Sequence, residues 1–131
     1  ALKTPKDQII NIEYTRDKSK KKAAYKKSKA INLKSDIDSI YTSTEKAARW
    51  YKVSVSSTKK RKAVTLSKDS VGGGFKFRVY QKGKLLKTVR VTKNDKVKTV
   101  KLPKKKGTYY VKVTKLTSKT TGAYYLGTYT Y

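Results

Sequence analysis

The chain has 131 residues, the size of one domain, and its 35 Lys or Arg residues against 8 Asp or Glu residues give a formal net charge of +27. It contains no Cys and no His, which excludes a disulfide framework, a Cys/His zinc site and a Ser-His-Asp or Cys-His catalytic set. No apolar run approaches the roughly 18 residues that a membrane-spanning helix needs.

The first 29 residues differ in composition from the rest and are predicted to form a basic N-terminal segment. Residues 9–14 could form a short strand or one helical turn, and we favour the strand. The composition of residues 18–27 favours a helix, yet seven lysines lie between Lys18 and Lys29 and repel one another along any helix face. We therefore expect the segment 1–29 to be partly helical or disordered, and a separate domain to cover residues 30–131.

From residue 30 onward, short stretches alternate between apolar and polar residues, the pattern of a half-buried strand. In the stretch 49–55, for example, Tyr51, Val53 and Val55 share one face and Trp50 lies on the other. Residues 36–41 continue the pattern without a clear inward face. The clearer predicted strands cover residues 30–33, 49–55, 63–67, 75–80, 85–91, 97–102, 108–113 and 123–129.

Glycines mark two of the connections between these strands. Gly72, Gly73 and Gly74 precede a strand and predict a sharp corner or a bulge. Gly83 lies in a predicted hairpin turn, where it would take a positive φ.

The strand lengths and spacings predict the fold class. Short strands at intervals of roughly 8–12 residues with turn residues between them are typical of an antiparallel sandwich or barrel. The chain is therefore predicted to be all-β, an antiparallel β-sandwich of about eight strands with a wet outer face on each sheet. Lysines on outer strands also discourage edge-to-edge aggregation, which is the simplest reading of many of them.

Four pieces of the sequence together resemble a known family. They are Ala-Ile-Asn-Leu at 30–33, Trp-Tyr-Lys-Val at 50–53, Phe-Arg-Val-Tyr with Gly-Lys-Leu-Leu at 77–86, and Gly-Thr-Tyr-Tyr-Val-Lys-Val with Gly-Ala-Tyr at 107–124. Residues 30–131 resemble the bacterial pre-peptidase C-terminal (PPC) domain, which is related to the collagen-binding modules of clostridial collagenases. The resemblance implies a jelly-roll-like β-sandwich, an extracellular location and a non-catalytic accessory role.

The lysine clusters predict a distributed polyanion-binding site. Lysine acts as a point charge that needs no fixed geometry, and such sites bind through charge and counterion release. Solvated turns kept apart by their charge are the alternative explanation for each cluster. The predicted residues are Lys20, Lys21, Lys22, Lys26, Lys27, Lys59, Lys60, Arg61, Lys62, Lys104, Lys105 and Lys106.

Three outward aromatic residues, Trp50, Tyr80 and Tyr110, form a second candidate site. Aromatic faces beside lysines can stack on sugars or bases. The alternative for Trp50 is packing against a neighbouring strand or the N-terminal segment.

These observations predict a secreted or cell-surface bacterial binding module without catalytic activity. Its eight acids are scattered in a strongly positive field that opposes the raised pKa of a general acid, so we do not expect an enzyme. Too few acids lie near Asp36 and Asp38 to supply the 6–8 oxygen ligands of calcium, and we expect neither a metal nor another cofactor. The expected partner is an anionic polymer such as teichoic acid or an acidic or sulfated polysaccharide. A nucleic-acid-binding protein and a structural accessory domain of a larger exported protein are the alternatives.

Overall fold

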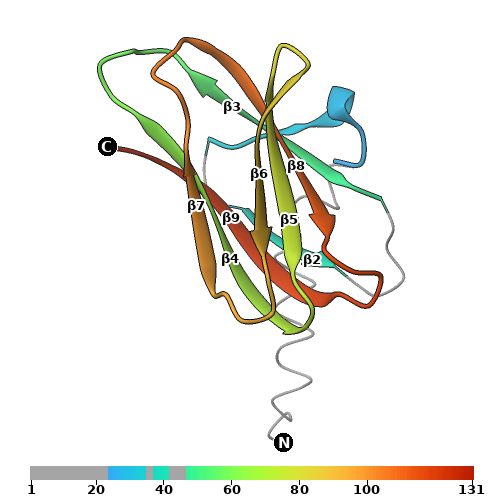
Figure 1. Cartoon of the computed structure of the whole chain (residues 1–131). Coiled ribbons are helices and arrows are strands. Elements are labelled where there is room, and N and C mark those ends of the chain that lie inside the picture. Colours follow the sequence, from blue (N-terminus) through green and yellow to red (C-terminus); the bar gives the residue numbers. More distant parts are fainter. Residues whose placement is uncertain (1–23, 35–36, 42–46) are drawn as a thin grey trace, which may run out of the picture.

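The structure, a computed structural model, describes residues 24–34, 37–41 and 47–131, without the side chains of residues 38–41 and 69–72. In this part of the chain, two β-sheets pack face to face (Figure 1). One sheet has the strand order β1-β3-β8-β5-β6 and the other the order β2-β9-β4-β7. The strands are β1 (Ile31–Asn32), β2 (Ile37–Tyr41), β3 (Arg49–Val55), β4 (Lys62–Gly72), β5 (Phe75–Gln81), β6 (Lys84–Val91), β7 (Val97–Lys101), β8 (Gly107–Lys115) and β9 (Thr121–Thr130).

The predicted all-β sandwich is confirmed, with one departure in strand direction. All strand neighbours in the two sheets are antiparallel except β1 and β3, which pair in parallel with Ile31 beside Tyr51. A single 3-10 turn, η1 (Lys27–Lys29), precedes β1 in the described residues. The prediction for residues 9–14 lies outside the described residues, as does the part of the predicted 18–27 helix up to residue 23. The described residues 24–26 form a turn and a bend instead of a helix, and Lys27 begins the 3-10 turn η1. The division of the chain at residue 30 stays a prediction.

The core forms where the inward faces of the two sheets meet. The predicted alternation of β3 is confirmed, because Tyr51, Val53 and Val55 are buried while Trp50 is only half-buried. The Tyr51 hydroxyl in one sheet forms a buried hydrogen bond with the Tyr124 hydroxyl in the other. The Tyr124 ring also meets Phe75 edge-on, with ring centroids 5.0 Å apart. Burial of such side chains contributes about 1.5–3 kcal/mol each and drives the packing of the sheets.

One cation breaks the rule that charges point outward. Arg49 begins β3 on the inward face and is 0% exposed. Its guanidinium carbon lies 5.8 Å from the centroid of the Tyr25 ring, which is a cation–π contact. The neighbouring Ala24 is fully buried, and its carbonyl accepts a 2.6 Å hydrogen bond from the Trp50 N–H. The chain just before η1 therefore packs against the start of β3.

The predicted glycine features are confirmed where β4 turns into β5. The β4–β9 register shifts between Asp69 and Gly72, which is a bulge, and Gly73 follows with φ of 74°. A Cβ on Gly74 would lie only 1.9 Å from the Val91 carbonyl oxygen, so the two backbones can approach this closely only at glycine.

The predicted positive φ of Gly83 is also confirmed. In the β5–β6 turn both Lys82 (φ 51°) and Gly83 (φ 76°) have left-handed backbone conformations, as two-residue hairpin turns of this kind require.

The β6–β7 turn provides a test of stability against pH. The Asp95 carboxylate accepts hydrogen bonds from the Thr92 backbone N–H (2.9 Å) and hydroxyl (2.8 Å). These bonds, with a smaller contribution from Lys98, hold the pKa of the Asp95 carboxyl below its usual value. The ionised group therefore stabilises the folded state above an unfolded pKa of about 4, and this stabilisation is lost as the pH falls through the lower folded value.

We expect Asp95→Asn to lower the thermal midpoint at pH 7 and to have a smaller effect at pH 3. Circular dichroism melts of both proteins at the two pH values measure this. The comparison between variant and wild type cancels the general charge repulsion that grows in acid. An equal difference at both pH values would show that the charge of Asp95 contributes nothing.

Candidate polyanion-binding surface

Three lysine-rich turns lie at one end of the sandwich, the upper end in Figure 1. Antiparallel pairing places them together. Val55 at the end of β3 is opposite Gly107 at the start of β8, and Gln81 at the end of β5 is opposite Tyr109. We call this set of turns the basic end. Its cations are Lys59, Lys60, Arg61 and Lys62 from the β3–β4 turn, Lys82 and Lys84 from the β5–β6 turn, and Lys104, Lys105 and Lys106 from the β7–β8 turn.

Hydrogen bonds tie the first and third of these turns to each other. The Arg61 Nε donates to the Leu102 carbonyl (2.9 Å), and the Leu102 N–H donates to the Lys62 carbonyl (2.8 Å). The Tyr109 hydroxyl donates to the Lys105 carbonyl (2.7 Å), and burial raises the pKa of the Tyr109 phenol, which favours the protonated form that donates this bond. The backbone that carries Lys104–Lys106 is thus held beside the β3–β4 turn.

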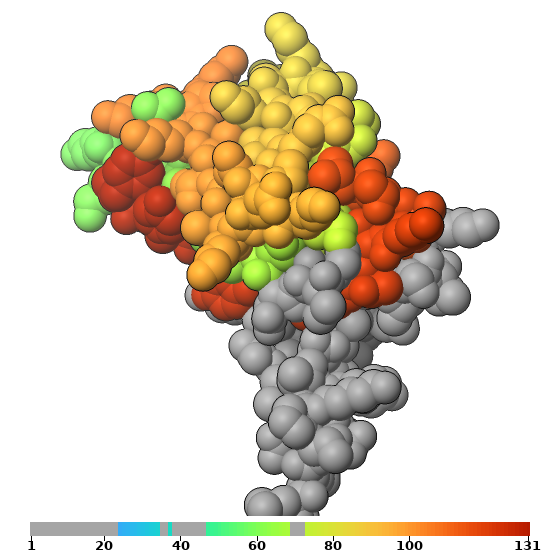
Figure 2. Space-filling model, turned by 60° about the horizontal axis from the view of Figure 1, so that its bottom comes forward, coloured from blue at the N-terminus to red at the C-terminus, as the bar shows by residue number. Residues whose placement is uncertain are grey.

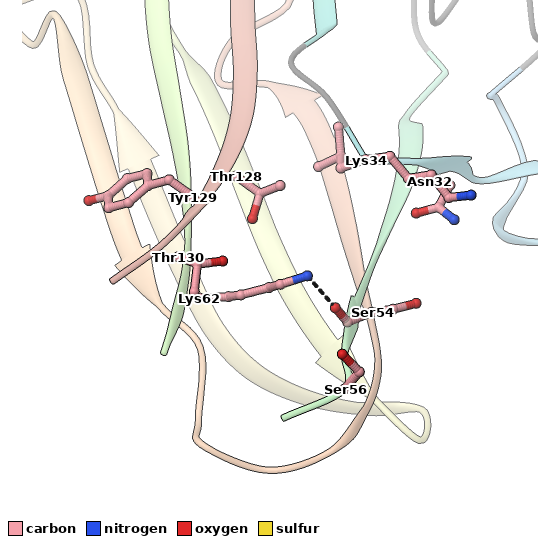
Figure 3. Close-up of a pocket in the computed structure, with 9 residues that line it drawn as sticks. Asn32, Lys34, Ser54, Ser56, Lys62, Thr128, Tyr129 and Thr130 are labelled. Carbon is pink, nitrogen blue, oxygen red and sulfur yellow. Dashed lines mark hydrogen bonds between the residues drawn. The ribbon is translucent and has the colours of Figure 1, made fainter. Parts of the chain in front are cut away.

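The cations of the basic end differ in how far their side chains are exposed to solvent. The side chains of Lys59, Lys60, Lys104, Lys105 and Lys106 are exposed. Arg61 and Lys62 are partly covered, and the Lys62 Nζ donates to the Ser54 carbonyl at 2.6 Å (Figure 3). We therefore expect the exposed lysines to contact a ligand and Arg61 and Lys62 to position the turns.

Sequence spacing alone does not group Lys82 and Lys84 with the other clusters. The β5–β6 turn holds only two lysines, separated by Gly83. The usable signal is the order of the hairpins, because successive hairpin turns alternate between the two ends of a sheet. None of the three turns contains Asp or Glu, whereas the β6–β7 turn at the opposite end contains Asp95.

The three predicted stacking residues also come together in space, on the outer face of the five-stranded sheet. Tyr110 of β8 pairs with Tyr80 of β5, and the rings of Trp50 and Tyr80 have centroids 5.7 Å apart. We call Trp50, Tyr80 and Tyr110 the aromatic face. All three side chains are half-buried.

Lysines already lie over two of these rings. The Lys27 Nζ is 4.8 Å from the Tyr110 centroid, and the Lys112 Nζ is 5.4 Å from the Trp50 centroid. Each such contact is worth about 0.5–1 kcal/mol at an exposed site. An anion on this face would therefore meet ammonium groups held on rings, and stacking on Trp50, Tyr80 and Tyr110 stays a prediction.

The cations around the aromatic face repel one another. The pKa of the Lys76 ammonium lies below its usual value, chiefly because the Arg78 guanidinium is close, with added effects of burial, Arg90 and Lys112. No strand of the five-stranded sheet contains Asp or Glu. The structure thus leaves this positive charge without an acidic neighbour on its own sheet.

Only some of the predicted N-terminal cations lie within the described residues. Lys20, Lys21 and Lys22 lie outside the described residues. Lys26 and Lys27 are exposed beside η1, where Lys27 reaches the aromatic face and not the basic end.

Two grooves lie near the basic end. One, of about 380 Å³, is lined by Asn32, Lys34, Ser54, Lys62 and Thr128 among others, and Lys62 crosses it from one sheet to the other (Figure 3). The second, of about 450 Å³, has the cations Arg61, Lys87 and Lys101 around apolar residues of β5, β6 and β7.

Within residues 24–34, 37–41 and 47–131, no helix has the length and hydropathy of a membrane span. No group of three or more His, Cys, Asp or Glu residues in those ranges is placed to hold a metal ion.

Comparison with solved structures supports the β-sandwich fold. No protein-family model and no curated protein matches the sequence. Among solved structures, the chain is similar to the PPC domain of a collagenase from Bacillus anthracis, with a TM-score of 0.57 and 17% identity over 76% of this chain and 92% of that one. The resemblance predicted from the residues is therefore confirmed for the fold.

Two further solved structures align less well. A periplasmic inhibitor of g-type lysozyme from Aeromonas hydrophila gives a TM-score of 0.49 at 12% identity, covering 76% of this chain and 96% of that one. A family 35 carbohydrate-binding module from an environmental isolate gives 0.48 at 18% identity, covering 73% of each chain.

Proposed function

We propose that this chain is a secreted or cell-surface, non-catalytic bacterial module that binds anionic polymers through the basic end. The observation that carries the proposal is the meeting of three acid-free lysine turns at one end of the sandwich. Exposed Lys59, Lys60 and Lys104–Lys106 supply point charges from two of these turns. Teichoic acid and acidic or sulfated polysaccharides are the polymers of matching charge.

The composition of the surface supports binding by charge and not by ordered recognition. The chain has 35 Lys or Arg residues in total, and only five of these are Arg. Lysine holds phosphate or sulfate without the bidentate geometry that arginine gives. A charge of +27 also destabilises the folded state by self-repulsion, so a bound polyanion would relieve a cost that the fold otherwise carries.

The structural comparison supports the accessory role. The similar solved structure with a TM-score of 0.57 is one domain of a collagenase, which is a larger bacterial protein. From this similarity we propose for the chain only the role of a non-catalytic domain in an exported protein. The lysine-rich turns, and not the comparison, support an anionic ligand for this chain.

Retention on immobilised heparin and on purified bacterial cell wall at 150 mM NaCl tests the proposal. We expect the protein to be retained and to elute only at higher salt, because release of counterions makes such binding fall steeply with ionic strength. A β-sandwich protein of near-zero net charge is the control. Elution together with that control would refute polyanion binding, and binding of DNA well above heparin at matched charge would favour a nucleic-acid partner.

A further inference from the structure

Two tyrosines at the end of β9 are more exposed than any ring of the aromatic face. Tyr129 and Tyr131 are each 49% exposed, and their ring centroids lie 5.8 Å apart at 42°. Both are on the outer face of the four-stranded sheet, and Figure 3 shows the Tyr129 ring pointing away from the groove beside Lys62. They were not among the residues predicted from the sequence to stack on a ligand.

These tyrosines belong to the basic end. Arg61 and Tyr131 exchange two backbone hydrogen bonds of 3.0 and 2.8 Å, and Tyr129 pairs with Ala63, which in turn pairs with Lys101. The Lys101 Nζ lies 5.4 Å from the Tyr131 centroid. In Figure 2 the C-terminal residues (dark red) lie against the light green β3–β4 turn and the orange residues of β7.

Next to the tyrosines, the outer face of the sheet carries uncharged residues. Thr65 of β4 pairs with Thr99 of β7 on one side and with Gly127 of β9 on the other. The Thr99 hydroxyl donates to the Thr65 hydroxyl at 3.0 Å, and Gly127 adds no side chain. A ligand lying on the tyrosines would therefore find hydroxyl groups on one side and the cations Lys101 and Arg61 on the other.

We infer that this tyrosine patch, made of Thr65, Thr99, Lys101, Tyr129 and Tyr131, binds a ring unit of an acidic polysaccharide. The inference rests on the proposed function and narrows its ligand to a polymer built from sugar rings that carry carboxylate or sulfate. The sugar ring lies on the tyrosines, its anionic group meets Lys101, and its hydroxyls meet the two threonines. An anionic polymer without rings can meet the lysines of the basic end but gains nothing from the tyrosines.

Charge argues against a second copy of this chain as the occupant. A second copy would bring another +27 to the patch, and its own patch carries Lys101 beside Arg61. Nucleic acid has rings and charge, and its bases also stack on aromatic side chains, so it is included in the test as the competing ligand. The hydroxyl groups of the two threonines match a hydroxylated sugar, which is therefore the occupant that we propose.

The test compares two polyanions of similar charge density, heparin with sugar rings and inorganic polyphosphate without them. Their affinities for the wild type, for Tyr129→Leu/Tyr131→Leu and for Tyr129→Phe/Tyr131→Phe are measured by isothermal titration at 50 mM NaCl. We expect the leucine variant to bind heparin about tenfold more weakly than the wild type and polyphosphate within twofold of it. The phenylalanine variant keeps the rings and should bind both polymers like the wild type.

The outcomes separate this inference from the proposed function. If the wild type binds neither polymer, the proposed function fails. If it binds both and the leucine variant is unchanged, or weakened equally for both, only the tyrosine patch is refuted. Single-stranded DNA is titrated as a third ligand, and a loss of affinity for it larger than the loss for heparin would assign the patch to nucleic acid and overturn its assignment to a sugar.

Discussion

Replacing Lys104, Lys105 and Lys106 together by glutamine should weaken binding to heparin about 100-fold at low salt. A lysine beside an anionic surface contributes about 1 kcal/mol, and 1.4 kcal/mol is a factor of ten in affinity. The three side chains are exposed, and the turn that carries them is anchored by Tyr109 and by the β3–β4 turn. The variant should therefore fold as the wild type does and lose only charge at the basic end.

The same experiment has a matched control at the opposite end of the sandwich. Lys93, Lys96 and Lys119 are also exposed and belong to the β6–β7 and β8–β9 turns. Their replacement by glutamine removes the same charge and should weaken heparin binding much less. The slope of log affinity against log salt should also fall by roughly 2–3 for the basic-end variant, one phosphate-like contact per lysine. Equal losses in the two triple variants would mean that net charge alone binds the polymer.

Replacing Tyr124 by alanine should have the largest effect on stability. The side chain is 1% exposed, meets Phe75 edge-on and bonds the Tyr51 hydroxyl of the opposite sheet. Truncation of a buried aromatic residue costs about 3–5 kcal/mol, and domains of this size have only about 5–15 kcal/mol of stability. We expect the thermal midpoint to fall by on the order of 10–20 °C.

Two further variants show which part of Tyr124 matters. Tyr124→Phe keeps the ring and removes the hydroxyl pair between the sheets, and its expected cost is about 1–3 kcal/mol. Tyr129→Ala removes a tyrosine of the same strand from a half-exposed position, with an expected change within about 0.5 kcal/mol. Denaturant unfolding of the three variants measures these differences. A Tyr124→Ala protein as stable as Tyr129→Ala would contradict the packing described for the core.

Some of the candidate site could be predicted from the sequence and some could not. Lys59–Lys62 and Lys104–Lys106 stand out as clusters in the printed chain, and both are turns in the structure. Their proximity depends on the pairing of β3 with β8 and of β4 with β7, which no single stretch encodes. Tyr129 and Tyr131 fall on the same face of the strand pattern as the half-buried Tyr125, so alternation alone does not show that they are more exposed.

By itself the sequence determined the local alternation: Phe75, Phe77 and Val79 turn inward on β5, and Gly83 makes a hairpin turn, because both depend on neighbours in the chain. Only the tertiary structure decided which turns meet, that β1 runs parallel to β3, and that Arg49 lies inside. These features depend on contacts between residues far apart in sequence, as Tyr51 and Tyr124 are. Such contacts form only when the two sheets bury their faces together.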